Sequence, residues 1–328
     1  MYIDNIFFSN FKNFELKNIK TDKINIIHGK NASGKTNTIE GIYTVLNGHS
    51  FKSKNTPLQK DITKKTVLSA TINNTQNIYV EIYKGKKNLK LNTKRATALS
   101  FKKKFPSILY SIDSFISFKD KKYLFSLFDR NIFIDNTKIA NMLIEYKKLI
   151  RIKKEAIYSI NKDLEFIKFI HEKVLNLMRS ISTERVKSVE IINSIINKTL
   201  NNFTDKQLYI EYKPYDYGQK NILKEELLKK RLITSLNKDK INILLNNKDI
   251  FTYASIGEKK IVLLSLILSI VLRYNEKIKP ILLIDDLEGD LDEDSKNISF
   301  KIIKELPNQL FLTTLGEYLY NDANIIRL

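Results

Sequence analysis

The sequence lacks cysteine altogether, is poor in glycine and contains no long hydrophobic run. Without cysteine the chain can form no disulfide and offers no thiolate ligand to a metal, which fits a reducing cytoplasm. Its longest apolar run, Ile261 to Leu272, is too short to span a bilayer and predicts a buried helix instead. The stretch MYIDNIFFSNFKNF lacks the basic-then-apolar order of a signal peptide. We therefore expect a soluble, cytoplasmic protein without a membrane partner.

Negative charge is scarce as well. Lysine and arginine number 56 against 36 aspartates and glutamates, which gives a formal net charge of +20. The excess has two open interpretations: a compositional bias that coats the surface with lysine, or a polyanionic partner, most often nucleic acid, held through its phosphates. With 328 residues and 43% hydrophobic content, the chain can bury a sizeable core in one large domain or two.

Because there are only nine glycines, their positions are informative. GKNASGKT, from Gly29 to Thr36, matches the phosphate-binding pattern G-x-x-x-x-G-K-[ST] in full. The preceding KINII reads as a short buried strand. The residues that follow repeat at helical spacing on one face: Ile39, Ile42, Tyr43 and Leu46. A strand, a glycine loop and a helix in this order predict a phosphate cradle rather than a plain surface turn.

The chemistry of such a loop assigns a role to each residue. Backbone N–H groups converge on the β-phosphate, and the helix N-terminus adds its positive dipole end. Lys35 is expected to reach the β- and γ-phosphates and to act in catalysis, and the Thr36 hydroxyl is expected to ligate Mg²⁺. The predicted ATP-binding residues of the loop are Gly29, Lys30, Asn31, Ala32, Ser33, Gly34, Lys35 and Thr36.

A second motif lies in the acidic stretch ILLIDDLEGDLDED, residues 281 to 294. Its apolar strand ends in two acids, the form of a Walker B segment, although adjacent acids at a strand end can also be a solvated loop or a helix cap. We predict that Asp285 holds the Mg²⁺ of a bound nucleotide, directly or through water. Asp286 is placed to orient or deprotonate the attacking water. The later acids are interpreted as loop and helix-start residues.

A third motif is YASIGEKKIVLL, residues 253 to 264. Ser255 and Gly257 precede the predicted buried helix, so their donors lie at a helix N-terminus, which favours a second anion site. A serine N-cap alone would also explain the serine. Together with Glu258 they resemble the S-x-G-[EQ] signature of ABC-type ATPases. In that class the signature of one subunit closes over the γ-phosphate bound by the other.

The middle of the chain separates these motifs. Residues 66 to 93 alternate as short strands and predict a hairpin-like β annex. From about 116 to 205 the pattern is helical, with a heptad seam made of Ile157, Ile160, Leu164, Ile167, His171, Val174, Met178 and Ile181. The seam predicts a compact lobe and a packed His171. The expected domains are residues 1–115 and 230–328, which form an ATPase head, and 116–229, the helical lobe.

Taken together, the motifs resemble the RecF family of bacterial recombination-mediator ATPases nearly end to end. The segments that carry the likeness are SNFKNFELKNI, GKNASGKTNTIEGIY, NGHSFKS, YASIGEKK, PILLIDDLEGDLDED and FLTT. In FLTT, Thr313 and Thr314 occupy the switch strand where transporter ATPases carry histidine. The family's G-P-H-R-D-D stretch reads SLNKDK here, which keeps Lys238 and Asp239 but replaces the histidine with Asn237.

This resemblance implies an α/β ABC-type P-loop ATPase head with an antiparallel β annex and an inserted helical lobe. It implies ATP and Mg²⁺ as cofactors, an ATP-dependent homodimer, and slow, DNA-stimulated hydrolysis. The expected partners are double-stranded DNA near single-strand junctions, and RecR-like and RecO-like proteins that help to load RecA. Two alternatives remain: the head of another SMC-like or anti-phage system, and an ABC transporter subunit. The switch threonines disfavour the transporter subunit.

Overall fold

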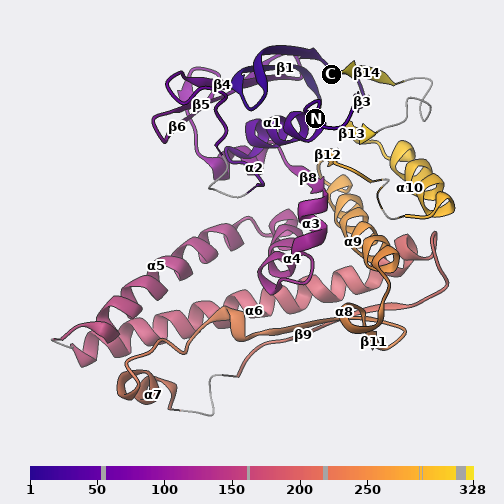
Figure 1. Cartoon of the computed structure of the whole chain (residues 1–328). Helices are drawn as coiled ribbons and strands as arrows, with labels where there is room; N and C mark the ends of the chain where they lie inside the picture. Colours follow the sequence, from indigo (N-terminus) through magenta and orange to yellow (C-terminus); the bar gives the residue numbers. More distant parts are fainter. Residues whose placement is uncertain (53–56, 161–162, 217–220, 288, 290, 315–322) are drawn as a thin grey trace. The chain divides into compact units, whose positions relative to one another are not determined.

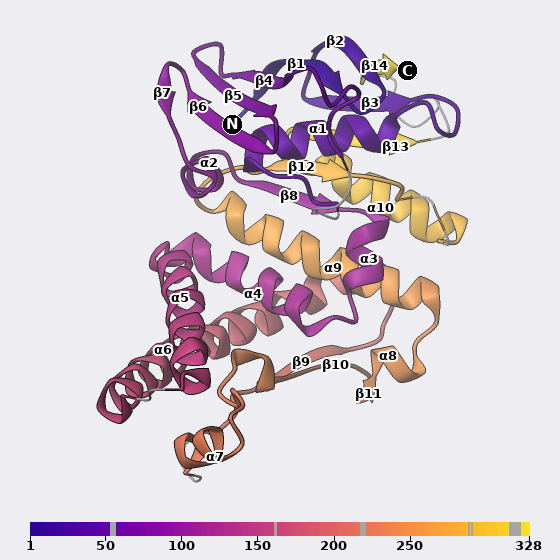
Figure 2. The ribbon, with the colours of Figure 1, turned by 60° about the vertical axis from the view of Figure 1, so that its left-hand side comes forward.

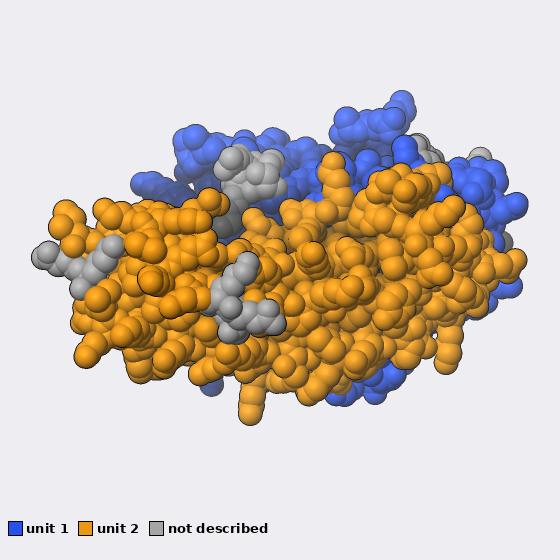
Figure 3. Space-filling view, turned by 90° about the horizontal axis from the view of Figure 1, so that it is seen from below, with its two compact units in different colours: residues 1–117, 256–328 blue, residues 118–255 orange. Residues whose placement is uncertain are grey.

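The computed structural model describes all residues except 53–56, 161–162, 217–220, 288, 290 and 315–322 (Figure 1). The chain forms two compact units, which Figure 3 distinguishes by colour: a head unit, residues 1–117 and 256–328, and a helical unit, residues 118–255. The sequence had placed residues 230–255 in the head. They group instead with the helical unit, because β10 (Lys240–Leu245) pairs antiparallel with β9 (Leu208–Lys213) along its whole length.

One sheet of the head unit is antiparallel and runs in the order β2-β1-β4-β5-β6-β7. Side chains alternate between its two faces, as β4 shows with its strict in–out burial pattern. The sheet contains the predicted annex, which extends over four strands. The bounds are β1 (Ile3–Phe11), β2 (Phe14–Lys20), β4 (Thr66–Ile72), β5 (Gln76–Tyr83), β6 (Lys86–Leu91) and β7 (Lys94–Arg95).

The other sheet of the head unit is parallel, in the order β14-β3-β13-β12-β8. Its strand β12 is buried at every position, as expected for a continuous apolar run covered on both faces. Since β3, β13 and β12 are neighbours, their carboxyl ends meet at one edge. The bounds are β14 (Asn324–Arg327), β3 (Ile24–His28), β13 (Leu310–Thr314), β12 (Ile281–Ile284) and β8 (Ser107–Tyr110).

Helix α1 (Lys35–Asn47) lies between the two sheets and contacts strands of both (Figure 2). From Thr38 onward every residue of the helix is buried. Gly41 permits this close packing, because a side chain there would meet the ring of Phe8 at 2.5 Å. The remaining helices of the head unit are α2 (Ala98–Lys104), α3 (Ile112–Ser117), α9 (Ile256–Asn275) and α10 (Glu293–Glu305).

Helix α9 contains the apolar run that the sequence singled out. All residues from Val262 to Val271 are buried, which confirms the prediction of a buried helix. In the part of the chain that the structure describes, no helix is both long and apolar enough to cross a membrane.

The helical unit consists of a helix hairpin, shorter helices and a small antiparallel sheet in the order β11-β10-β9. Helices α4 and α5 pack against the long α6. Beyond β9 and β10, the elements are α4 (Lys121–Asp135), α5 (Lys138–Tyr158), α6 (Leu164–Leu200), α7 (Ile222–Leu228), η1 (Leu236–Lys238), β11 (Lys248–Asp249) and α8 (Ile250–Tyr253).

The predicted heptad seam is correct at Ile157 and from Ile167 onward, but wrong at Ile160 and Leu164. Ile167, Val174 and Ile181 are fully buried, whereas Ile160 is 99% exposed. The reason is a break in the chain direction, because α5 ends at Tyr158 and α6 begins at Leu164. The apolar residues keep a spacing of three and four across this break. Periodicity alone therefore did not reveal where one helix ends and the next begins.

Asp239, which the SLNKDK stretch keeps, is buried in the helical unit. Its carboxylate accepts hydrogen bonds from the Tyr212 hydroxyl at 2.5 Å and the Tyr215 N–H at 3.0 Å. Arg185 lies 3.8 Å from it and binds Asp129 through two hydrogen bonds of 2.9 and 3.0 Å. Asp239 therefore joins β9, β10 and α6, a structural role that suffices to explain why this carboxylate is needed here.

A second buried network joins α5, α6 and α7. The Lys153 ammonium lies 2.6 Å from the Glu226 carboxylate, and it donates to His171 Nδ1 at 2.7 Å and to the Thr234 hydroxyl at 2.8 Å. Glu226 also accepts the N–H groups of Ile233 and Thr234. Burial, reinforced by the charge of Lys153, lowers the pKa of His171 to about 4. The prediction of a packed His171 is confirmed, with the addition that its ring is a hydrogen-bond acceptor.

This geometry makes the stability of the protein depend on pH through His171. An unfolded histidine takes up a proton below about pH 6.5, whereas the folded ring stays neutral down to about pH 4. The contribution is therefore complete above pH 6.5 and is lost as the pH falls toward 4, by roughly 2 kcal/mol between pH 7 and pH 5. We expect His171→Asn, which keeps an acceptor for Lys153 but does not titrate, to lose less stability over that range. Urea unfolding of both proteins at pH 7 and pH 5 measures this, and equal losses would contradict it.

Candidate nucleotide-binding site

The glycine loop lies where the sequence predicted it, between the end of β3 at His28 and the start of α1 at Lys35. Gly34 has a φ of 111°, a left-handed conformation, and the amide of Asn13 occupies the space where a side chain would stand. The same amide donates to the Ser33 carbonyl at 3.0 Å and accepts from Asn37 at 2.9 Å. Asn13, from the turn between β1 and β2, thus fixes the loop, a role that the sequence motifs did not indicate.

The side chain of Lys35 lies over its own loop. Its ammonium donates to the carbonyl oxygens of Gly29 at 2.6 Å and Lys30 at 3.0 Å. The cation is thereby held beside backbone N–H groups that converge at the start of α1. A phosphate bound there would be attracted both by the ammonium and by the positive end of the helix dipole.

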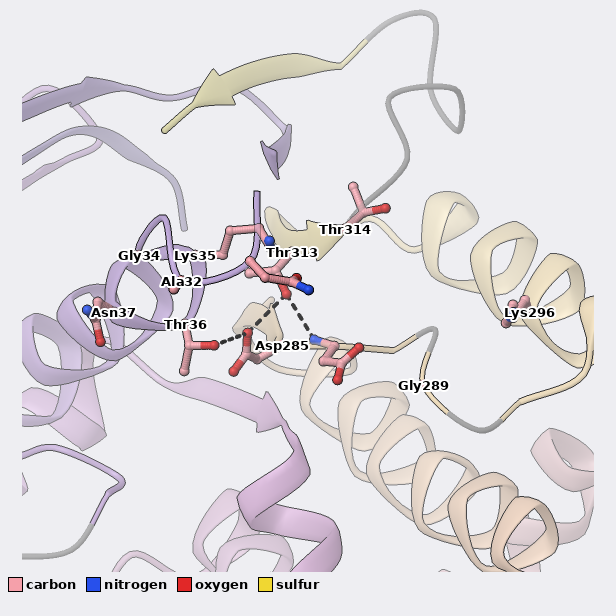
Figure 4. Close-up of a pocket in the computed structure, with 12 residues that line it drawn as sticks. Ala32, Gly34, Lys35, Thr36, Asn37, Asp285, Gly289, Lys296, Thr313 and Thr314 are labelled. Atoms are coloured by element: carbon pink, nitrogen blue, oxygen red, sulfur yellow. Dashed lines mark hydrogen bonds between the residues drawn. The ribbon is translucent and has the colours of Figure 1, made fainter. Parts of the chain in front are cut away.

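A chain of hydrogen bonds connects the loop to the two neighbouring strands (Figure 4). One oxygen of Asp285, directly after β12, accepts from the Thr36 hydroxyl at 3.1 Å and from the Thr313 hydroxyl at 3.0 Å. The Thr313 oxygen in turn accepts the N–H of Asp286 at 2.9 Å. The structure therefore brings together the predicted residues Thr36, Asp285 and Asp286 and adds Thr313 as the group that links the two acids.

Asp285 is a buried carboxylate, with 2% of its surface exposed. Burial raises its pKa, the two threonine hydroxyls oppose that rise, and the neighbouring charge of Asp286 adds to it. Two neutral donors therefore do not fully compensate the buried negative charge. A carboxylate and a hydroxyl 3.1 Å apart are hard oxygen ligands of the kind that Mg²⁺ takes from a protein when nucleotide phosphates complete its shell. These residues fit a magnesium ion.

Asp286 differs from its neighbour in both exposure and backbone. It is exposed, and its φ of 56° is in the left-handed region, which non-glycine residues adopt in only a few per cent of cases. The hydrogen bond from its N–H to Thr313 holds this conformation, and strained backbone of this kind is common at functional sites. Its side chain faces a cleft where water is available, which suits the predicted role in positioning a nucleophile.

The cleft measures about 660 Å³ and opens beside the glycine loop. The switch threonines and one lysine of α10 complete its walls. Its lining residues are Asn31, Ala32, Gly34, Lys35, Thr36, Asn37, Asp285, Asp286, Gly289, Lys296, Thr313 and Thr314. This set contains most of the predicted loop and both Walker B acids.

The signature residues are placed differently. Ser255 is exposed and directly precedes α9, whose first turn contains Gly257 and Glu258. The helix start that the sequence predicted is thus present. None of these three residues is among the described residues that line the cleft.

Glu40 is a buried charge near the site that the motifs did not reveal. This residue of α1 is fully buried, accepts a hydrogen bond of 2.6 Å from the Ser50 hydroxyl, and lies 3.5 Å from the ammonium of Lys12 and 3.8 Å from that of Lys52. Lys52 also attenuates the pKa rise of Asp285. Glu40 therefore fixes the segment after α1 against helix α1, and places Lys52 where its charge acts on Asp285.

Comparisons with known proteins identify the family of the chain. A family model described as RecF/RecN/SMC N terminal domain matches residues 2–327. The protein "DNA replication and repair protein RecF" of Carboxydothermus hydrogenoformans is 29% identical over 95% of this chain and 94% of its own length. The protein of the same name from Thermoanaerobacter pseudethanolicus is 28% identical over 98% of this chain and 97% of its own.

Solved structures give the same fold. "Structure of the recombination mediator protein RecF-ATPrS in RecFOR pathway" has a TM-score of 0.85 at 22% identity and covers 100% of this chain and 96% of that one. An Smc head bound to the C-terminal winged-helix domain of ScpA has a TM-score of 0.61 at 18% identity, with coverages of 100% and 94%. The predicted fold class, an ABC-type ATPase head with an antiparallel annex and an inserted helical lobe, is confirmed.

The geometry separates the roles of the two acids. We expect Asp285→Asn to weaken binding of Mg-ATP, because the metal loses its charged ligand, while binding without Mg²⁺ changes little. Asp286→Asn should bind Mg-ATP normally, since only the exposed carboxylate changes. Titration calorimetry with and without Mg²⁺ distinguishes the two variants. Equal loss of Mg-ATP binding in both would show that the assignment is wrong.

Proposed function

Because this chain belongs to the RecF/RecN/SMC N-terminal domain family, we propose that it is an ATP-dependent DNA-binding protein of recombinational repair and replication restart. It dimerises around two ATP molecules, holds duplex DNA near single-strand junctions, and is released by slow, DNA-stimulated hydrolysis. Proteins that resemble RecR and RecO act with it to load a RecA-like recombinase. Relatives named RecF that align along nearly the whole chain support this proposal.

The observation that carries the ATPase is the hydrogen-bonded series of Thr36, Asp285, Thr313 and Asp286. Lys35 and the loop N–H groups hold the phosphates, and Thr36 and Asp285 hold Mg²⁺, which supplies charge neutralisation at the γ-phosphate. Asp286 orients the attacking water and takes up its proton. Thr313 keeps the two acids in fixed relative positions, so that metal binding and water activation occur at neighbouring but distinct groups.

The separation of the two predicted anion-binding segments supports dimerisation. Ser255, Gly257 and Glu258 lie outside the cleft that contains Lys35. We place them over the γ-phosphate bound by a second copy of the chain, so that each nucleotide bridges two subunits. Hydrolysis removes the bridge and opens the dimer, which makes ATP a switch.

The β annex supports DNA as the partner. Residues 84–95 contain six lysines and arginines and no acid. The strand register places Tyr79, Lys90 and Arg95 side by side across β5, β6 and β7, on the face opposite the buried Val80. A basic surface of this kind attracts phosphates without reading sequence, so it supplies affinity rather than specificity.

Of the two alternatives, a transporter subunit is disfavoured because a threonine hydroxyl, rather than a histidine, bonds to the metal-binding carboxylate. The head of another SMC-like or anti-phage system shares the fold, as the Smc head structure indicates. The relatives named RecF favour the first proposal over this one.

A mixing experiment tests the shared sites. Lys35→Ala and Ser255→Arg should each abolish hydrolysis alone, because every site in either homodimer carries a lesion. A mixed dimer collects both lesions in one site and leaves the other intact. With random pairing and independent sites, activity should return to about a quarter of wild type.

The control is a crosslinking assay that verifies mixed dimers in the same sample. No recovery despite abundant mixed dimers would count against shared sites. Wild-type activity of the Ser255→Arg protein alone would exclude them.

Salt dependence tests the DNA surface. Replacing Lys86, Lys90 and Arg95 together by glutamine should weaken duplex binding and reduce the slope of log affinity against log salt by up to roughly 3, because each lost phosphate contact removes about 0.9. The matched control replaces three exposed lysines elsewhere in the head unit: Lys279, Lys301 and Lys304. Fluorescence anisotropy from 50 to 200 mM salt measures both. Equal effects of the two triple variants would show that only overall charge matters.

A further inference from the structure

Lys260, in the second turn of α9, is a lysine that the proposed function leaves without a role. Only 5% of its surface is exposed, although lysine is among the residues least often buried unless its charge is compensated. Its ammonium donates to the backbone carbonyl of Gly289 at 2.5 Å and lies 5.3 Å from the centre of the Phe115 ring. The lysine therefore connects the signature helix to the segment that follows the Walker B acids.

The surroundings of Gly289 bring Lys260 close to Asp286. A side-chain Cβ built on Gly289 would lie 3.4 Å from one carboxylate oxygen of Asp286 and 3.6 Å from the ammonium of Lys260. The two charged groups thus approach the same point, one from the segment after β12 and the other from α9. Asp286 donates its backbone N–H to Thr313, and Gly289 is the residue that its carboxylate and the Lys260 ammonium both approach.

Packing alone does not call for a lysine at this position. An apolar side chain of equal length would fill the space beside Phe115 without the desolvation of an ammonium group. What the lysine adds is a donor to the Gly289 carbonyl and a positive charge near the point where Gly289 meets the Asp286 carboxylate. Both act on the geometry of the proposed hydrolysis site.

We propose that Lys260 is a positioning residue for hydrolysis, which holds Gly289 and the Asp286 carboxylate of its own subunit in place from the signature helix. Gly257 is three residues earlier on the same helix and lies on the same face. When the signature turn of one subunit contacts the nucleotide bound by a second subunit, Lys260 thereby transmits this contact to Asp286 of the first subunit. This inference rests on the proposed ATPase and its shared sites.

Three variants separate this role from simple packing. Lys260→Met keeps the length but removes the donor and the charge, and it should lower kcat on the order of 10²-fold, the effect of a misplaced reacting group, with KM for ATP nearly unchanged. Lys260→Arg keeps both and should restore most of the rate. Lys259→Met, the neighbour on the same turn, is the matched control and should hydrolyse ATP at the wild-type rate.

A second measurement distinguishes the subunit on which Lys260 acts. If it positions Asp286 of its own subunit, the Lys260→Met lesion belongs to the same site as Lys35→Ala. A mixture of those two proteins should stay inactive, whereas a mixture of Lys260→Met with Ser255→Arg should recover to about a quarter of wild type. A lysine that only supports the signature turn would give the opposite pattern of recovery.

The outcomes decide between the proposals. Wild-type kcat in folded Lys260→Met, or recovery with Lys35→Ala instead of Ser255→Arg, overturns the role of Lys260 and leaves the proposed ATPase intact. If Lys260→Met does not fold, a Lys260→Arg protein that folds but is as slow as Asp286→Asn overturns it as well. If Lys35→Ala and Ser255→Arg fail to complement each other, this result would instead contradict the shared sites of the proposed function.

Discussion

The arrangement of the head unit depends on one buried carboxylate at the end of a central strand. Asp285 follows β12, and its oxygen needs hydrogen-bond donors because only 2% of the residue is exposed. Those donors come from both sides, Thr36 at the start of α1 and Thr313 on β13. The buried charge is therefore tolerated only when four elements are aligned: the glycine loop, helix α1 and the parallel strands β12 and β13. The same alignment forms the cleft.

The sequence could predict the parts of this site that are local. Two motifs specify their geometry within a few residues. One is the glycine loop between a strand and a helix, and the other is the apolar strand that ends in acids. The buried helix α9 followed from an equally short apolar run, whereas the fold class was what the resemblance to the RecF family implied. Asp285 and Thr36 were assigned to one metal in this way, although 249 positions separate them.

Contacts without a local pattern could not be predicted. Asn13 supports the loop from the turn between β1 and β2, and Glu40 pairs with Lys12 of that turn and with Lys52 of the segment after α1. Nothing in their spacing distinguishes them from surface residues, because only the pairing of strands brings them together. The heptad seam failed for the related reason that periodicity carries no information about where a helix stops, so Ile160 was placed on a face that the chain had already left.

A comparison of two buried carboxylates, Glu226 and Asp285, indicates which kind of charge would compensate the carboxylate in the cleft. Burial by itself raises the pKa of Glu226, but Lys153 and two backbone N–H groups outweigh it, so the pKa lies below its usual value. Asp285 is buried to a similar degree, receives only neutral hydroxyls, and keeps a raised pKa. The first carboxylate has its cation within the fold and is structural. The second accepts hydrogen bonds from two hydroxyls, and the charge of the more distant Lys52 also opposes the rise of its pKa. It lies beside the phosphate loop, which is where the magnesium ion of the proposed function would be held.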